Sequence, residues 1–280
     1  PEPVGGSWVS TVTVCLTGDV HHMSMETRDQ AYMDRTEVEA AIEYAEIAAS
    51  YDVPVTLFVT GRAAVEEPDR VEQLATMQNV EIGGHNYWAF DTPVHTAWRA
   101  IGKLTGGQIG SWNGPRRFQR YEIGRTLTAL TERGATVTAW RDHAYRHDRH
   151  TATLLADAGI THFSDSVGPD ERVRQEDGVT VVPVNTPPDH EHIYHAFRTP
   201  EFVAANEFEG PFGSDSYDAD RWLDWICDTI ADVSKAGQPA TVLALPECME
   251  LAEGLATFSQ LCLHIDDHYE PRCLGNVNAS

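Results

Sequence analysis

The sequence predicts an α/β fold in which parallel strands form a barrel that is covered by helices. Two observations carry this prediction. Short runs of β-branched and apolar residues alternate with longer segments of helical periodicity, and at least six such units follow one another without an obvious break. An open, doubly wound sheet is the alternative arrangement. A chain of 280 residues can bury one large core, so we expect a single domain over residues 1–280.

Each expected strand is a short apolar run rich in β-branched residues. The run Val53-Pro54-Val55-Thr56-Leu57-Phe58-Val59 shows the pattern, and Gly61 follows it. By the same criterion, strands are expected over residues 11–16, 53–59, 80–84, 135–140, 160–163, 179–184 and 240–245.

The segments between these strands carry one apolar face at helical spacing. Helices are expected over residues 36–51, 68–77, 121–133, 151–158 and 218–235, with a further helix after the last strand. A stretch rich in Pro, Asp, Gly and Ser, about residues 185–218, is expected to be the longest loop.

The formal net charge is −23, from 43 acidic and 20 basic residues, and only Lys103 and Lys235 are lysines. This charge weighs against nucleic acid or an anionic membrane surface as a partner. An acidic surface almost free of lysine is typical of proteins that stay soluble in molar salt, whereas an ordinary acidic enzyme would not explain the scarcity of lysine. Neither a membrane span nor a signal-peptide pattern is visible, so we expect a cytoplasmic protein of an extreme halophile.

Polar side chains follow several expected strands, at the point where each strand ends. They occur in the stretches Thr17-Gly18-Asp19-Val20-His21-His22, Gly84-His85-Asn86-Tyr87-Trp88, Arg141-Asp142-His143-Ala144-Tyr145 and Leu245-Pro246-Glu247. In parallel barrels the reacting groups stand at the carboxyl ends of the strands. An aspartate, several histidines and an arginine on one face are what a metal-activated water and its general base require.

Several stretches also occur in a familiar order. They are the helix after Glu37, the strand 53–59 with Gly61, Glu81-Ile82-Gly83-Gly84-His85, Trp140-Arg141-Asp142-His143, Thr151-Ala152-Thr153-Leu154-Leu155 with Gly159, and Ala244-Leu245-Pro246-Glu247. This order resembles polysaccharide deacetylases with a NodB-type domain, over about residues 10–265. The resemblance implies a distorted (β/α)7 barrel. It also implies metal-dependent removal of acetyl groups from N-acetylated sugars, by attack of metal-bound water on the amide carbonyl.

The family's metal and base residues carry over only in part. Asp19 matches the first acidic residue of the Asp-Asp or Asp-x-Asp motif, which implies the general base. The metal-binding acid of that motif falls on Val20 or His21. His85 matches the first metal histidine of His-x-x-x-His, but the second falls on Ala89.

Other motif positions diverge as well. Arg141 matches the arginine that orients the base, while the proline two positions later is His143. The late histidine that protonates the leaving amine falls on Leu245, so His143 becomes a candidate proton donor. Trp88 and Tyr145 flank the expected site and could stack on a sugar ring, although aromatic residues at strand ends often serve packing alone.

A catalytic zinc ion normally keeps three protein ligands and one open position. Asp19, His21 and His85 could form such a set, with His22 or Asp91 as substitutes, so we expect a divalent metal such as zinc. A second metal site is conceivable in the expected loop, at His190, His192 and His195, although a solvated loop is the simpler interpretation.

The sequence thus predicts a metal-dependent, polysaccharide deacetylase-like hydrolase that acts on the N-acetyl group of a carbohydrate. Two alternatives stay open. One is a non-catalytic protein of the same fold that binds a glycan or a partner, which the losses at Ala89 and Leu245 favour. The other is altered chemistry on the same scaffold, such as that of a lyase or an epimerase.

Overall fold

A computed structural model describes residues 12–21, 29–107, 109–206 and 208–279. These residues form a nine-stranded sheet in the order β6-β7-β5-β4-β3-β2-β1-β8, with β9 paired to the start of β1. The pairs are parallel except β6–β7. The strands are β1 (Thr13–Val20), β2 (Val55–Thr60), β3 (Val80–His85), β4 (Ala139–Arg141), β5 (His162–Phe163), β6 (Arg174–Glu176), β7 (Val179–Val181), β8 (Ala240–Leu243) and β9 (Glu270–Pro271).

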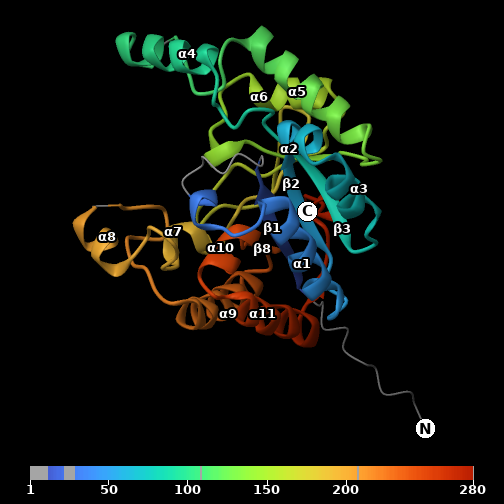
Figure 1. Ribbon diagram of the computed structural model, residues 1–280, viewed down its shortest axis with the longest axis vertical. Coiled ribbons are helices and arrows are strands. Elements are labelled where there is room, and N and C mark those ends of the chain that lie inside the picture. Colours follow the sequence, from blue (N-terminus) through green and yellow to red (C-terminus); the bar gives the residue numbers. More distant parts are fainter. Residues whose placement is uncertain (1–11, 22–28, 108, 207, 280) are drawn as a thin grey trace.

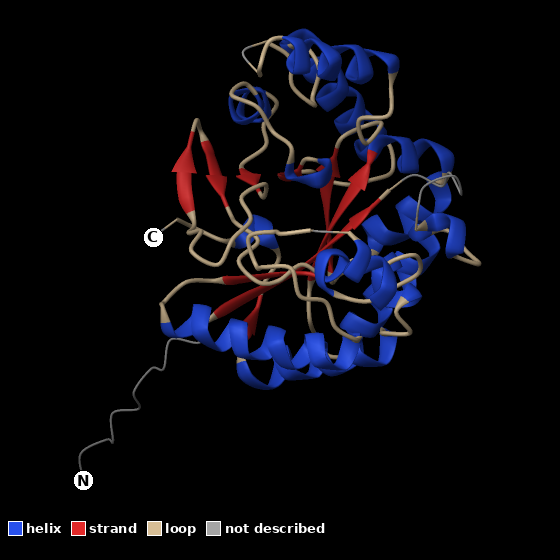
Figure 2. Cartoon of the chain, turned by 90° about the vertical axis from the view of Figure 1, so that its left-hand side faces the viewer, coloured by secondary structure: helices blue, strands red, loops and turns tan. Residues whose placement is uncertain are grey.

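Helices cover the outer side of this curved sheet (Figure 2). Helices α9 and α11 lie side by side at one end of the molecule, and α4, α5 and α6 gather at the other (Figure 1). The helices are α1 (Glu37–Ala49), α2 (Gly61–Glu66), α3 (Pro68–Thr76), α4 (Pro93–Leu104), α5 (Arg116–Thr131), α6 (Thr151–Asp157), α7 (Asp189–His192), α8 (Pro200–Ala205), α9 (Ala219–Lys235), α10 (Pro246–Leu251) and α11 (Leu255–His268), with single turns η1 (Gln30–Tyr32), η2 (His143–Tyr145) and η3 (Leu274–Asn276).

The barrel closes through side chains between β8 and the segment after β7. The side-chain amide of Asn185 donates to the Pro239 carbonyl at 3.0 Å and accepts from the Thr241 backbone amide at 2.9 Å. The Thr186 hydroxyl donates to the Thr241 carbonyl at 3.0 Å. Because β8 would otherwise leave backbone groups unpaired along this edge, these contacts stand in for a neighbouring strand.

The barrel interior is filled by alternate strand residues and by the C-terminal segment. Buried Cys15, Phe58 and Ala139 cluster there with Leu274 and Val277 from the end of the chain. Because side chains alternate along a strand, Thr17 and Asp19 share the face of Cys15 and extend this interior row to the carboxyl end of β1. The first strand therefore presents Asp19 to the mouth of the barrel.

The predicted fold class is confirmed, with differences in individual elements. Strand β1 continues to Val20, so Asp19 lies within it and not after it. Helix α4 was not expected, because its sequence is interrupted by Gly102 and only His95 is buried along it. The expected loop at 185–218 contains the short helices α7 and α8, and the antiparallel β6 also lacks a clear apolar signal because all its residues are exposed.

In the part of the chain that the structure describes, none of the helices has the length and apolar character that crossing a membrane would require.

Candidate active site

Four parallel strands deliver the sequence-predicted residues to one end of the barrel. Asp19 is the next-to-last residue of β1, and His85 and Arg141 are the last residues of β3 and β4 and lie opposite each other in the sheet. Leu245 follows β8 by two residues. Gly84 allows β3 and β4 to approach in this way, because a Cβ atom there would overlap the Trp140 ring.

Asp19 and Arg141 form a buried ion pair. Arg141 Nη1 donates to Asp19 Oδ1 at 2.9 Å, and the guanidinium also donates to the carbonyl and the hydroxyl of Ser164 at 3.1 and 2.8 Å. Burial by itself would raise the pKa of Asp19, but the charges of Arg141, His85 and His21 outweigh burial and bring the pKa below its ordinary value. Asp19 is therefore held ionised and oriented, as a general base must be.

His85 is wholly buried with one ring nitrogen unpaired. Its Nδ1 lies 2.7 Å from the Arg141 carbonyl, which can only accept, so Nδ1 carries the proton and Nε2 presents a lone pair. Nε2 is buried and has no hydrogen-bond partner. Burial lowers the pKa of His85 to about 4, so the ring is neutral at pH 7. A neutral imidazole with one nitrogen fixed by a carbonyl and the other free is the usual state of a metal ligand.

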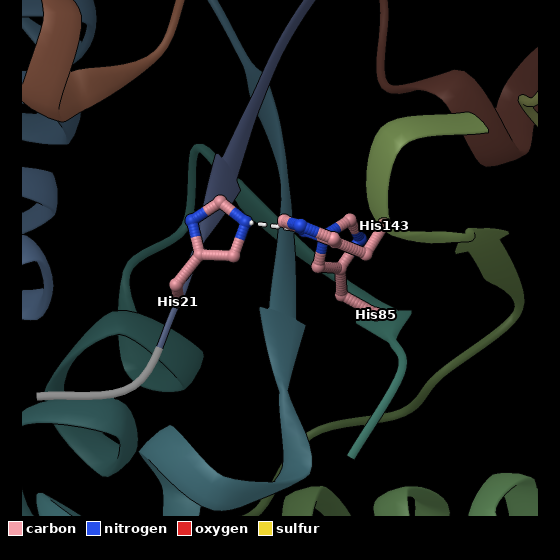
Figure 3. Close-up of side chains that lie close together, drawn as sticks. All are labelled: His21, His85 and His143. Carbon is pink, nitrogen blue, oxygen red and sulfur yellow. Dashed lines mark hydrogen bonds between the residues drawn. The ribbon is translucent and has the colours of Figure 1, made fainter. Parts of the chain in front are cut away.

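Three histidines converge at this end of the barrel (Figure 3). They are His21, which directly follows β1, His85 of β3 and His143 of η2. One nitrogen from each lies within 4.8 Å of the others. His21 Nε2 and His143 Nδ1 are 3.0 Å apart, which means that the two rings share a proton between them. The other nitrogen of His21 lies 3.2 Å from Glu37 Oε1 on α1, and a carboxylate behind a histidine in this way orients it and increases its basicity.

This cluster fits a divalent metal ion such as zinc. Three imidazoles are a known ligand set of catalytic zinc, and the unpaired Nε2 of His85 is the buried polar atom that such an ion would satisfy. The cluster differs from the set expected from sequence: His143 replaces Asp19, which is paired with Arg141 instead. His22 lies outside the described residues, and exposed Asp91 belongs to neither metal-compatible group among the described residues.

A second group shares His21 but is acidic. His21, Glu37 and Glu247 also have ligand atoms within 4.8 Å of one another, and both carboxylates are buried. Glu247 was among the residues expected at the end of the last strand, whereas Glu37 was not expected at the site. The sign of Glu37 in the sequence was its position at the start of a helix, where an acidic residue is stabilised by the helix dipole.

Two strained turns shape the histidine cluster. Ala89 and Phe90 follow β3 with φ of 45° and 63°, and Ala144 and Tyr145 in η2 have φ of 52° and 56°. Such left-handed conformations are costly for residues other than glycine and are concentrated at functional sites. The Phe90 ring lies 5.8 Å from the His143 ring, so the two turns meet at the cluster.

A buried network that sequence analysis missed holds His143. The Asn86 side chain accepts from the His143 backbone amide at 2.7 Å and donates to Asp142 at 2.8 Å. Asp142 also accepts from Trp140 and Asn113, while burial and nearby Asp165 raise its pKa well above the usual range. In the sequence, the only sign of this network was that Asn86 follows His85 and that Asp142 precedes His143.

Trp88 and Tyr145, the predicted sugar-binding residues, lie in different surroundings. Trp88 is half-buried, stacks at 6.0 Å on Phe118 of α5 and has the Arg125 guanidinium 4.8 Å from its ring. The Tyr145 hydroxyl is buried, and burial raises its pKa well above the usual range, while Arg141 and Asp19 act on it electrostatically. Tyr145 therefore belongs to the site, whereas Trp88 is integrated into an aromatic cluster on α5.

His190, His192 and His195 do not converge in the described structure. His192 Nδ1 lies 2.7 Å from the Asp215 carbonyl, and His195 Nδ1 lies 2.9 Å from the Ile193 carbonyl. The metal-compatible groups found among the described residues include none of the three. The idea of a second metal site at these histidines therefore has no geometric support.

Neither a family model nor a curated protein matches this sequence. Solved structures do. A protein of Mycobacterium smegmatis classed as a polysaccharide deacetylase superposes with a TM-score of 0.69 at 18% identity, covering 98% of this chain and 91% of that one. The allantoinase PuuE superposes with a TM-score of 0.63 at 13% identity, over 95% and 88% of the two chains. A mutant of a pseudoenzyme of carbohydrate esterase family 4 gives 0.50 at 14%, over 93% and 65%.

These similarities show the fold. The chain has the NodB-type polysaccharide deacetylase fold, with motifs that diverge from those of the family at Ala89 and Leu245.

Proposed function

We propose that this chain is a metal-dependent hydrolase that cleaves the N-acetyl group of a carbohydrate. The observation that carries the proposal is the buried, neutral and unpaired Nε2 of His85, which faces His21 and His143 beside the ion pair of Asp19 and Arg141. The structural similarity to a protein classed as a polysaccharide deacetylase supports the substrate class.

His21, His85 and His143 would hold the ion. When bound, the ion would lower the pKa of a water molecule to about 7 and would polarise the substrate carbonyl. Asp19 accepts the proton of the attacking water, and Arg141 keeps the carboxylate ionised and directed toward the mouth. Glu37 holds the His21 ring through Nδ1, and the Arg141 carbonyl does the same for His85. Tyr145, and Trp88 farther out, would contact the sugar.

The test combines metal analysis with an activity assay. Protein purified without a histidine tag should carry about one equivalent of a divalent metal, and it should release acetate from N-acetylglucosamine oligomers. Chelation should abolish the release and zinc should restore it. Metal-free protein that binds no added zinc would contradict the proposal.

A non-catalytic relative is the second candidate, and the absence of histidines at Ala89 and Leu245 favours it. Under this hypothesis the strand-end site binds a glycan without cleaving it. A variant with both Ala89→His and Leu245→His should gain deacetylation if the protein has lost an ancestral activity. If the wild type is inactive and this variant gains neither metal nor activity, the barrel serves binding or assembly.

We further propose that the protein works in the cytoplasm of an extreme halophile. The charge of −23 with two lysines supports this.

A further inference from the structure

The leaving-group side of the site needs a proton donor. When an amide is cleaved, the departing nitrogen must be protonated, because an unprotonated amide nitrogen leaves too slowly. Leu245, at the end of β8, has no proton to give, and His143 is engaged with His21 in the metal-compatible cluster. This inference rests on the proposed function and concerns the remaining side of the same site.

A hydrogen bond links helix α7 to Leu245, which follows the end of β8 by two residues. Asp189, which is wholly buried, accepts the Leu245 backbone amide at 2.5 Å through Oδ2 and the His190 backbone amide at 2.7 Å through Oδ1. The Trp222 indole donates to the Pro187 carbonyl at 3.1 Å and fixes the chain where it enters α7. The Asp189 carboxylate therefore links the backbone of Leu245, whose side chain cannot give a proton, to the backbone of His190, whose imidazolium can.

His190 lies beside Tyr145 in this position. Its Nδ1 is buried 3.7 Å from Asp189 Oδ1, and its ring lies 6.2 Å from the ring of Tyr145, whose hydroxyl is close enough to Asp19 and Arg141 to be affected by their charges. The side chain is 32% exposed, so a substrate can reach it.

We propose that His190 is the proton donor to the leaving nitrogen, positioned at the end of β8 by Asp189. A residue remote in sequence from the strand end thereby supplies the acid that Leu245 cannot.

The charges around His190 favour its protonated form. Burial alone would lower the pKa of His190, but Asp189 and Glu191 on its own helix, together with Asp19 on β1, outweigh burial and raise the pKa above the ordinary value. His192 on the same helix is held by the Asp215 carbonyl, and burial lowers its pKa.

The reaction balances with these groups. The water oxygen bonds to the carbonyl carbon while Asp19 takes one water proton. The carbon–nitrogen bond then breaks as the imidazolium of His190 gives its Nε2 proton to the nitrogen, which yields acetic acid and a free amine. The acid passes its proton to the amine or to solvent and leaves as acetate. Asp189 Oδ1 lies 3.7 Å from Nδ1 and Glu191 Oε1 lies 3.8 Å from Nε2, so both carboxylates favour the return of the ring to its protonated form. The proton on Asp19 returns to His190 through solvent.

The experiment compares His190→Asn with wild type on two substrates. On N-acetylglucosamine oligomers, kcat should fall by about 10²–10⁴-fold, the usual contribution of a general acid. On 4-nitrophenyl acetate it should change by less than about threefold, because nitrophenolate leaves without a proton. Metal content should be unchanged, and His268→Gln, at an exposed position of α11, should match wild type on both substrates. A merely structural role of His190 would lower both rates together.

Two further measurements separate the outcomes. The double variant His190→Asn with Leu245→His should recover amide cleavage, because it places an imidazole on the same strand end. In NMR titrations, Asp19→Asn should lower the pKa of His190, whether or not substrate turns over. An active wild type whose amide cleavage survives His190→Asn would overturn the assignment alone. A wild type inactive on both substrates would overturn the proposed function, and the assignment with it.

Discussion

The two sides of the strand-end site place their polar groups in different ways. On the side of β1, β3 and β4, each chemical group comes directly from a strand end or the turn after it, as Asp19, His85, Arg141 and His143 do. On the side of β8, the strand end carries Leu245, and the polar groups come from α7 in a long connecting segment. Under the proposed function, the comparison teaches that the groups that activate the water and the group that protonates the leaving nitrogen can be changed separately, since they come from different parts of the chain.

Removal of His85 should have the largest effect on metal binding and activity, because His85 belongs to the side formed by β1, β3 and β4. The variant His85→Ala deletes the one buried ring nitrogen without a partner in the histidine cluster, so the metal should be lost and hydrolysis should fall to background. Metal content and acetate release measure this. The same change at exposed His268 is the control, and retention of metal in His85→Ala would place the ion elsewhere, for example at the acidic group around Glu247.

Asp19→Asn should separate catalysis from metal binding on that side. Asn cannot accept the proton, so kcat should drop by about 10²–10⁴-fold, while the three histidines still hold the metal. Single-turnover rates and metal content are the measurements. Asp228→Asn on the exposed face of α9 makes the same chemical change away from the site. Loss of metal from Asp19→Asn would show that the carboxylate is a ligand.

Arg141→Met should reduce stability and change its pH dependence. It leaves Asp19 buried without its partner, which costs about 3–5 kcal/mol of unfolding free energy. In the wild type the folded pKa of Asp19 is depressed, so its contribution to stability is present above the unfolded pKa of ~3.9 and is lost as pH falls through the folded pKa. The variant should lack this acid-side loss. Denaturant titrations at several pH values test this, with Arg174→Met, whose ion pairs are exposed, as the control.

Trp88→Ala should tell packing from sugar binding. Removal of a ring that stacks on Phe118 should cost stability, and a direct sugar contact should also raise KM by several-fold, since a stacked aromatic pair contributes about 1 kcal/mol. Tyr121→Ala, in the same aromatic cluster, is the matched control. Equal effects of the two variants on KM would assign Trp88 to packing alone.

The smallest expected effect concerns salt. Arg35, Arg70 and Arg174 each pair with two carboxylates, yet the chain keeps an excess of negative charge because acidic residues outnumber basic ones by 43 to 20. Screening should therefore raise the midpoint of thermal unfolding between ~0.1 M and ~2 M salt, by ~2–4 °C for each kcal/mol gained. Changing Asp224 and Asp228 on α9 to Asn should reduce this dependence. Equal midpoints would contradict halophilic adaptation.

The sequence by itself determined the barrel and one side of the site. Alternating apolar runs and helical periodicity are local signals, and a parallel sheet necessarily brings the carboxyl ends of its strands to one edge. That rule was sufficient to place Asp19, His85 and Arg141 together. The resemblance to NodB-type deacetylases identified the divergence at Leu245, which stands where that family has a histidine.

Only the tertiary structure decided which groups face one another. The contact between His21 and His143 joins residues 122 positions apart. It depends on the left-handed turn at Ala144 and on the hydrogen bond from the His143 backbone amide to Asn86, and neither feature has a local signal in the sequence. Likewise, the stretch around His190 has the composition of a solvated loop, and it becomes part of the site because Asp189 binds the Leu245 amide 56 residues away. Side-chain direction and long-range hydrogen bonding are properties of the packed chain, so no pattern along the sequence could have predicted them.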